Sequence, residues 1–173
     1  MKIPYDDYFL TMCYLVAQRS PDPSTKCGAV LVSGERKILS TGYNGPIKGS
    51  DDSMIPLERP AKYAHLLHAE ENCLLAYNGS YQDIVGSTMY VTGRPCHKCL
   101  RMILQKGVKR IVTTDGNMAV MQDDSEAKIY ELMLSYTKGV EMNVLSNLPN
   151  IIGLLDHTKK YIIEKNPKLN EQP

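Results

Sequence analysis

Apolar residues at helical spacing open the chain. Between Tyr5 and Arg19 the stretch predicts an amphipathic helix, and the two prolines of SPDPST (20–25) end it. Two β-rich runs follow, CGAVLVS (27–33) and KILSTGY (37–43), joined by the turn-prone SGERK, which predicts a hairpin. The apolar positions that define the helix are Phe9, Met12, Cys13, Val16 and Ala17.

The second half of the chain alternates between helical and strand patterns. Residues 44–64 come first; they carry prolines and glycines without a sustained period, which predicts a long irregular segment of the kind that often serves function. The alternation that follows predicts an α/β fold with parallel strand pairing in this half. Helices are expected at 68–77, 96–106, 125–136 and in a last stretch to 164, and strands at 88–92, 109–114 and 140–145.

Composition favours one domain with a small polar ligand. With 173 residues and 43% hydrophobic content, residues 1–165 can form a single core, and 166–173 form a polar tail. Lys and Arg number 20 against 19 Asp and Glu, so no basic excess supports nucleic-acid binding. The first residues lack a signal-peptide pattern and no stretch has the length of a membrane span, which predicts a cytoplasmic location.

The five cysteines favour reduced thiols and metal ligation over disulfides. Cys13, Cys27 and Cys73 have apolar neighbours and are interpreted as core thiols. Cys96 and Cys99 differ, because RPCHKCL (94–100) has the spacing by which two thiolates bind one metal ion at the start of a helix. This motif alone is equally compatible with structural zinc, redox chemistry or chance.

A histidine and a glutamate in HAEENCLLAY (68–77) extend the metal motif. His68 supplies a third ligand, which leaves one tetrahedral position open for water, and Glu70 is near enough to act as the base without being a ligand. The combination H-x-E followed by P-C-x-x-C is the signature of zinc-dependent nucleobase deaminases. In that chemistry activated water attacks C4 of a cytosine. The glutamate takes the water's proton, protonates N3 and then helps the amine leave as ammonia.

The alternative is a structural zinc site, which normally has a fourth protein ligand. Cys73 lies five residues after His68 and therefore about 140° round the helix, pointing away. His65 precedes the helix and is expected to be exposed. The catalytic interpretation is therefore favoured.

The chain resembles the deoxycytidylate (dCMP) deaminase family of the cytidine-deaminase-like superfamily over residues 5 to about 145. The resemblance implies a three-layer α/β/α fold with a mixed five-stranded sheet and helices on both faces. It also implies zinc-dependent conversion of dCMP to dUMP for thymidylate synthesis, in a hexamer activated by dCTP and inhibited by dTTP. The matching motifs are Arg19–Pro23 (R-S-x-D-P), Cys27–Ala29, Gly42–Gly45 (G-Y-N-G), Ser50–Asp52 (S-D-D), His68–Cys73 and Pro95–Cys99.

The resemblance also suggests residues that contact the substrate and the effectors. The resemblance suggests that Asn44 bonds the sugar or base, although Asn-Gly is also a common turn pair. Asn72 shares a helix face with His68, where it would bond substrate or brace the loop. The remaining expected contacts are Ala69 for substrate, Ser24, Thr25 and Lys26 for the 5′-phosphate with Arg59, Arg94 and Lys98 as others, and Tyr43 and Gly45 for effectors.

Departures from the family pattern leave alternatives open. Asp115–Met118 replaces a polar and aromatic pair, and the insertion lacks cysteines, which predicts one zinc per chain; Mg²⁺ would accompany triphosphate effectors. Deamination of nucleic acid is disfavoured, because the chain has no Trp and a single Phe for stacking. Deamination of dCTP or C5-modified dCMP, and an inactive nucleotide-binding subunit, remain as alternatives, although the presence of Glu70 argues against the last.

Overall fold

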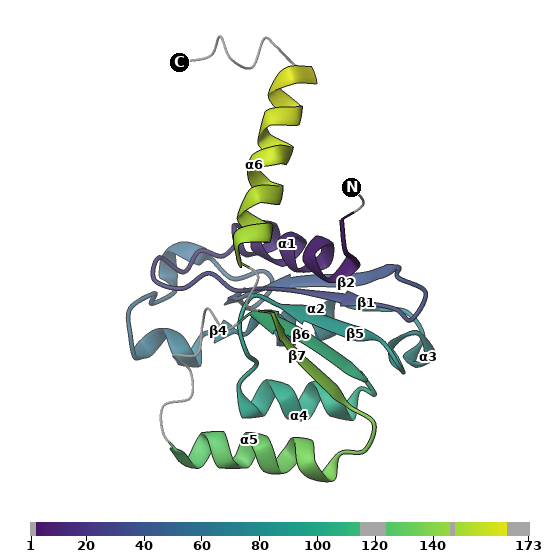
Figure 1. Cartoon of the computed structure of the whole chain (residues 1–173). Coiled ribbons are helices and arrows are strands. Elements are labelled where there is room, and N and C mark those ends of the chain that lie inside the picture. Colours follow the sequence, from purple (N-terminus) through teal and green to yellow (C-terminus); the bar gives the residue numbers. More distant parts are fainter. Residues whose placement is uncertain (1–2, 115–123, 146–147, 166–173) are drawn as a thin grey trace.

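The computed structural model describes residues 3–114, 124–145 and 148–165. A five-stranded sheet runs through the molecule in the order β2-β1-β5-β6-β7 (Figure 1). The mixed five-stranded sheet that was expected is therefore confirmed. Its strands are β1 (Gly28–Val32), β2 (Ile38–Tyr43), β5 (Thr88–Val91), β6 (Arg110–Thr114) and β7 (Glu141–Leu145).

The direction of the strands follows the two halves of the sequence. β1 pairs antiparallel with both β2 and β5, so the predicted hairpin is present. β5, β6 and β7 pair in parallel, as the alternation of strands and helices predicts. All residues of β1 are buried, because β1 lies between two other strands and contacts both α1 and α2.

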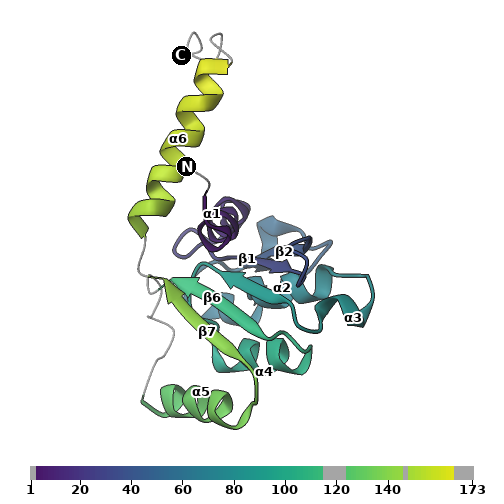
Figure 2. The same ribbon diagram turned by 45° about the vertical axis from the view of Figure 1, so that its right-hand side comes forward.

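Helices form a layer on each side of the sheet (Figures 1 and 2). α1 (Tyr5–Ala17) packs on one face, and α6 (Leu148–Lys165) contacts α1 and extends away from the sheet. α2 (Ala69–Ala76), α4 (His97–Gln105) and α5 (Asp124–Tyr136) cover the other face. Each face has its own buried apolar cluster, so the α/β/α prediction is confirmed.

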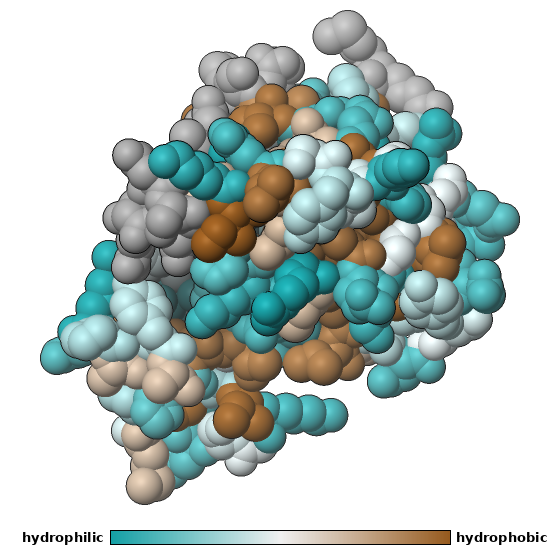
Figure 3. Space-filling view, turned by 90° about the horizontal axis from the view of Figure 1, so that it is seen from below, coloured by the Kyte–Doolittle hydropathy of each residue, from teal (hydrophilic) through white to brown (hydrophobic). Residues whose placement is uncertain are grey.

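The outer surface of the second helical layer is mixed in character. Seen from that side, apolar side chains are dispersed among polar ones (Figure 3). Ile129, Leu132 and Tyr136 of α5 are among the exposed apolar residues. Within the described ranges no helix has both the length and the apolar content needed to cross a membrane.

Two glycines let helices approach the sheet closely. A Cβ added at Gly28 would lie 2.0 Å from the backbone oxygen of Cys13 in α1. A Cβ added at Gly42 would lie 2.2 Å from the backbone nitrogen of Cys73 in α2. Any larger residue would therefore push these helices away, and α2 begins next to the candidate site.

Several short elements differ from the expectation. The insertion is irregular over much of its length, but β3 (Gly45–Pro46) pairs antiparallel with β4 (Leu66–Leu67). It also contains the 3-10 turns η1 (Asp52–Met54) and η2 (Ala61–Ala64), and a short helix α3 (Tyr81–Ile84) precedes β5. The predicted tail at 166–173 and the departure at Asp115–Met118 lie outside the described residues.

Candidate active site

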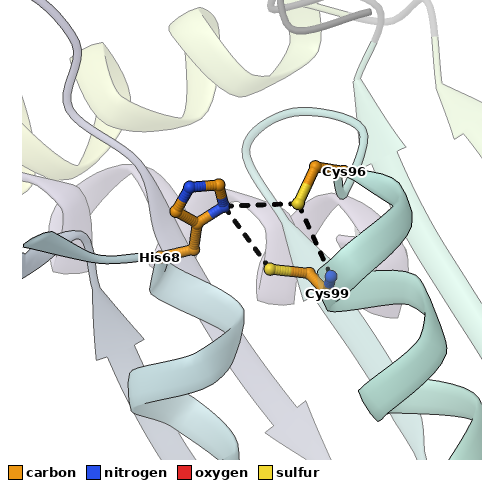
Figure 4. A group of neighbouring side chains, drawn as sticks. All are labelled: His68, Cys96 and Cys99. Carbon is orange, nitrogen blue, oxygen red and sulfur yellow. Dashed lines mark hydrogen bonds between the residues drawn. The ribbon is translucent and has the colours of Figure 1, made fainter. Parts of the chain in front are cut away.

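Two helices begin beside each other and carry the expected metal ligands. His68 occupies the N-cap position of α2 and Cys96 that of α4, both in extended backbone conformation. Figure 4 shows the imidazole of His68 facing the sulfurs of Cys96 and Cys99. Its Nδ1 lies 3.6 Å from Cys96 Sγ and 3.4 Å from Cys99 Sγ. The structure thus brings together the three residues that the spacing predicted.

These distances fit a zinc ion. Tetrahedral coordination with bonds of about 2.0–2.3 Å separates a nitrogen and a sulfur ligand by about 3.6 Å, close to both observed values. One imidazole and two thiolates are also ligands that zinc prefers. With zinc bound, the same contacts would be edges of the coordination tetrahedron.

A structural site with four protein ligands is not supported. Within the described part of the chain, His68, Cys96 and Cys99 are the only group of three metal-binding side chains whose ligand atoms lie within 4.8 Å of one another. Cys73 is buried on the far side of α2, where its sulfur meets the hydroxyl of Ser40 at 3.4 Å. His65 is exposed, as expected. A metal ion held by these three side chains would have one tetrahedral position that no other described residue fills.

The three ligands share protons unequally. Hydrogen bonds from Cys99 and from His68 lower the pKa of Cys96 to about 3, against the opposing effect of burial. The same Cys96 contact raises the pKa of Cys99, and burial adds to the rise. The hydrogen bond with Cys96 also raises the pKa of His68 to about 9. Metal binding requires all three groups to be deprotonated, so uptake of zinc would release protons here.

Glu70 lies in the first turn of α2 with 5% of its surface exposed, and it lines the cleft beside the metal ligands. Burial raises the pKa of Glu70 to about 7, a value suited to a group that both takes and gives a proton near neutral pH. Its neighbour Glu71 has a different task, because its carboxylate accepts a hydrogen bond from the backbone N–H of His68 and caps the helix. Of the two acids, Glu70 is the one that lines the cleft.

A cleft opens in front of Glu70, and four parts of the chain line it. They are the loop before β1, the turn after β2, the insertion from Arg59 through the start of α2, and the end of β5 continuing to Cys96. Cys27 was interpreted as a core thiol; it packs against the buried apolar cluster, but it is only partly buried and also lines this cleft. Burial raises the pKa of its thiol to about 11, so the thiol is protonated at neutral pH.

The predicted asparagines occupy different positions. Asn44 lines the cleft, where its Oδ1 accepts from the Cys27 N–H at 2.7 Å and its Nδ2 donates to the Thr25 carbonyl at 2.9 Å. Asn72 is absent from the lining and donates to the Tyr43 carbonyl at 2.8 Å, which favours the bracing alternative. Ala69 is buried and lines the cleft, whereas neither Tyr43 nor Gly45 does.

The three predicted phosphate donors are mostly occupied or distant. The backbone N–H and hydroxyl of Ser24 both donate to Asp22 Oδ1, at 2.9 Å each, and the Thr25 N–H donates to the same oxygen at 3.2 Å. Lys26 is exposed and lies 3.5 Å from the Gln18 carbonyl. Thr25 alone among these three lines the cleft. The cationic side chains that line it are those of Arg59, Lys62 and Arg94.

Lys62 is a site residue that the sequence interpretation missed. Its Nζ lies 2.6 Å from Asp22 Oδ2 and 2.6 Å from Ser24 Oγ, and the Lys62 and Asp22 side chains are each 3% exposed. Burial would raise the pKa of Asp22, but hydrogen bonds from Lys62, Ser24 and Thr25 together lower it. The pair joins the insertion to the loop before β1. No local signal in the sequence marks a loop lysine as buried.

Comparison with known proteins places the chain among deaminases. Residues 4–115 match the family described as cytidine and deoxycytidylate deaminase zinc-binding region. The chain is 38% identical over 133 residues to a deoxycytidylate deaminase of Mus musculus, and 37% identical over 116 residues to one of Homo sapiens. The mouse match covers 73% of this chain and 74% of the relative, and the human match 64% of each.

Solved structures agree with this placement. A dCMP deaminase from the cyanophage S-TIM5, in complex with dCMP and dUMP, is 27% identical with a TM-score of 0.66. That match covers 84% of this chain and 99% of the phage protein. The apo form of the phage enzyme is 26% identical with a TM-score of 0.58, over 84% of this chain and all of that one (100%).

Proposed function

Because this chain belongs to the cytidine and deoxycytidylate deaminase zinc-binding family, we propose that it hydrolyses dCMP to dUMP and ammonia. The observation that carries the proposal is the His68, Cys96 and Cys99 group at zinc-ligand distances, with the buried carboxyl of Glu70 beside it. An inactive deaminase-like subunit that only bound nucleotide would have no use for a buried acid at this place.

In the proposed reaction three residues bind the metal and Glu70 transfers protons. His68, Cys96 and Cys99 hold zinc, which when bound supplies a Lewis acid that lowers the pKa of a coordinated water. Glu70 takes a proton from the water, gives it to N3 of the cytosine and then assists departure of the amine. The C4–N bond breaks, a C4–O bond forms, and the products are a uracil and ammonia. Because C4 gains one oxygen substituent and loses one nitrogen substituent, no redox partner is needed.

The start of α2 offers a backbone N–H donor that could bind the carbonyl group of the cytosine base. Ala69 is the first residue of the helix, where a backbone N–H has no partner within the helix, and it lines the cleft beside Glu70. This N–H would donate to O2 of the cytosine, with Asn44 holding the sugar side and Thr25 near the phosphate. Asn72 would act through the Tyr43 carbonyl by fixing the turn after β2.

The choice of dCMP is supported by the relatives named deoxycytidylate deaminase and by the phage enzyme whose structure contains dCMP and dUMP. In this role the product dUMP would supply thymidylate synthesis in the cytoplasm. Activation by dCTP with Mg²⁺, inhibition by dTTP, effector contacts at Tyr43 and Gly45, and assembly into a hexamer belong to the same proposal. Deamination of dCTP or of C5-modified dCMP is the second candidate, since the same zinc chemistry serves both.

The test is ammonia release from dCMP, CMP, dCTP, deoxycytidine and a cytosine-containing oligonucleotide, each with and without dCTP and dTTP. We expect dCMP to be the preferred substrate, tuned by the triphosphates. Glu70→Gln should keep its zinc and lose turnover by at least about 100-fold. Glu71→Gln is the matched control, because it removes the neighbouring charge but keeps the helix cap. Full activity of Glu70→Gln would refute the mechanism.

A further inference from the structure

The positively charged side chains of the cleft differ in what neutralises them. Lys62 is paired with Asp22 at 2.6 Å. Arg59 is exposed and donates to Thr25 Oγ1 at 3.1 Å. Arg94 is half-buried, and within the described ranges it has neither an ion pair nor a hydrogen bond. Among the described residues neither Arg59 nor Arg94 has an anionic partner, and Arg94 is the one whose buried Nε also lacks a hydrogen-bond partner.

The surroundings of Arg94 hold it in place without satisfying it. Its Nε is buried and lacks a hydrogen-bond partner. Its guanidinium lies 5.7 Å from the centre of the Tyr130 ring. Tyr130 is itself 2% exposed, and its hydroxyl donates to Met142 Sδ at 3.2 Å, so the ring is a fixed support. The aromatic contact orients the side chain but offers no acceptor to its N–H groups.

Burying a guanidinium without acceptors is costly, and a ligand that provides them recovers that cost on binding. The planar fork of N–H donors matches two oxygens of a phosphate group, and such bidentate pairs are among the strongest hydrogen bonds in proteins. The neighbouring acid of the cleft, Glu70, belongs to the chemistry and forms no ion pair with Arg94. No side chain in the described part of the chain supplies an acceptor to the Arg94 Nε, and a bound ligand can supply one.

We propose that Arg94 binds the 5′-phosphate of the nucleotide and thereby makes the cleft select a nucleotide over a nucleoside. This inference rests on the proposed function, since it concerns the same cleft. Arg94 is two residues before Cys96, so the phosphate-binding wall is continuous with the metal-binding helix start. Arg59, on the wall formed by the insertion, contributes a second positive charge to the same cleft.

The experiment compares dCMP and deoxycytidine as substrates of the wild type and of Arg94→Gln. We expect KM for dCMP to rise about 10- to 100-fold, the range for losing hydrogen bonds to a charged group, with kcat changed much less. The kcat/KM for deoxycytidine should stay within a factor of about 3. Inorganic phosphate should inhibit deoxycytidine turnover in the wild type and not in the variant. Arg94→Lys, which keeps the charge without the fork, should recover part of the loss.

Arg101→Gln is the matched control, because Arg101 is an exposed arginine of α4 outside the cleft. Equal losses for dCMP and deoxycytidine in Arg94→Gln would overturn the proposal, since they would indicate support of the metal site instead. Unchanged kinetics for both would overturn it as well.

Equilibrium binding separates this inference from the proposed function. Should the wild type fail to deaminate dCMP, titration calorimetry with dCMP and with deoxycytidine still tests Arg94. A loss of dCMP affinity confined to Arg94→Gln supports the phosphate role, and equal affinity of wild type and variant for dCMP overturns it.

Discussion

Breaking the Lys62–Asp22 ion pair should both destabilise the fold and loosen the cleft. The pair joins the insertion to the loop before β1, and both side chains are 3% exposed. Lys62→Met removes the ammonium group and keeps a similar length of side chain. Asp22→Asn removes the carboxylate charge and keeps the shape. The two substitutions therefore leave opposite charges buried in nearly the same packing.

The magnitude follows from what each remaining partner retains. Loss of one member of a buried ion pair costs about 3–5 kcal/mol. After Lys62→Met, Asp22 still accepts from the Ser24 N–H, the Ser24 hydroxyl and the Thr25 N–H, so we expect the lower end of this range, about 3 kcal/mol. After Asp22→Asn, the Lys62 ammonium keeps Ser24 Oγ as its close acceptor, so we expect the upper end, about 4–5 kcal/mol.

Urea unfolding at neutral pH measures both values. The double variant should be less destabilised than the sum of the two, with a coupling of about 1–3 kcal/mol. Lys48→Met, an exposed lysine of the same insertion, is the control and should change the free energy of unfolding by less than about 0.5 kcal/mol. Single variants that both unfold like the wild type would show that the pair does not bear on stability, and the reasoning from burial would be wrong.

The remaining predictions concern the helix contact, an outer ion pair and the metal. Gly42→Ala should cost about 3 kcal/mol and reduce turnover, because its Cβ would lie 2.2 Å from the α2 backbone. In the control Gly34→Ala the added Cβ would have no atom within 4 Å, so the free energy of unfolding should not change. Equal destabilisation of the two variants in urea unfolding would contradict this reasoning. Asp6 accepts two bonds from Arg110, at 2.7 and 2.8 Å, which lower its pKa. Ionised Asp6 therefore makes its full contribution to the free energy of unfolding above about pH 4, and this contribution is lost as the pH falls through the folded-state pKa of Asp6. The stability gap between wild type and Asp6→Asn should be about 1–2 kcal/mol at pH 7 and close in acid; a gap independent of pH would refute the sign. Removal of the metal by a chelator should abolish turnover and lower Tm, and added Zn²⁺ should restore both. Metal analysis should give one zinc per chain, and a value of two would contradict the prediction.

Much of the fold was predictable because its signals are local. The helix expected at 96–106 is His97–Gln105, and the strand expected at 109–114 is Arg110–Thr114. The α3 helix was missed although a signal exists, since Ser80 caps it by accepting from the Gln82 N–H at 3.2 Å. The ladder between β3 and β4 has no such signal. Two residues on each side show no period, and the pairing of Gly45 with Leu67 depends on how the whole insertion folds back.

The candidate site likewise contains residues that local sequence signals predict and residues that only the folded chain brings together. His68 and Glu70 are two residues apart, and Cys96 and Cys99 are three apart. The geometry of a helix start therefore fixes the relative position of the two residues in each pair, independently of how the rest of the chain folds. By contrast, Lys62 meets Asp22 across 40 residues of sequence. A lone lysine in a loop is normally solvated, and its burial is a property of the folded insertion.

This division also predicts how substitutions will act on the reaction. Glu70 and the metal ligands stand at the starts of α2 and α4, where the positive ends of the helices favour a carboxylate and thiolates. Gly42 fixes that part by letting α2 lie against β2. The opposite walls, with Thr25, Arg59 and Lys62, are loops joined by an ion pair. Changes at the helix starts should therefore lower kcat, whereas changes in the loop walls should raise KM with kcat less affected, because they alter binding and leave the reacting groups in place.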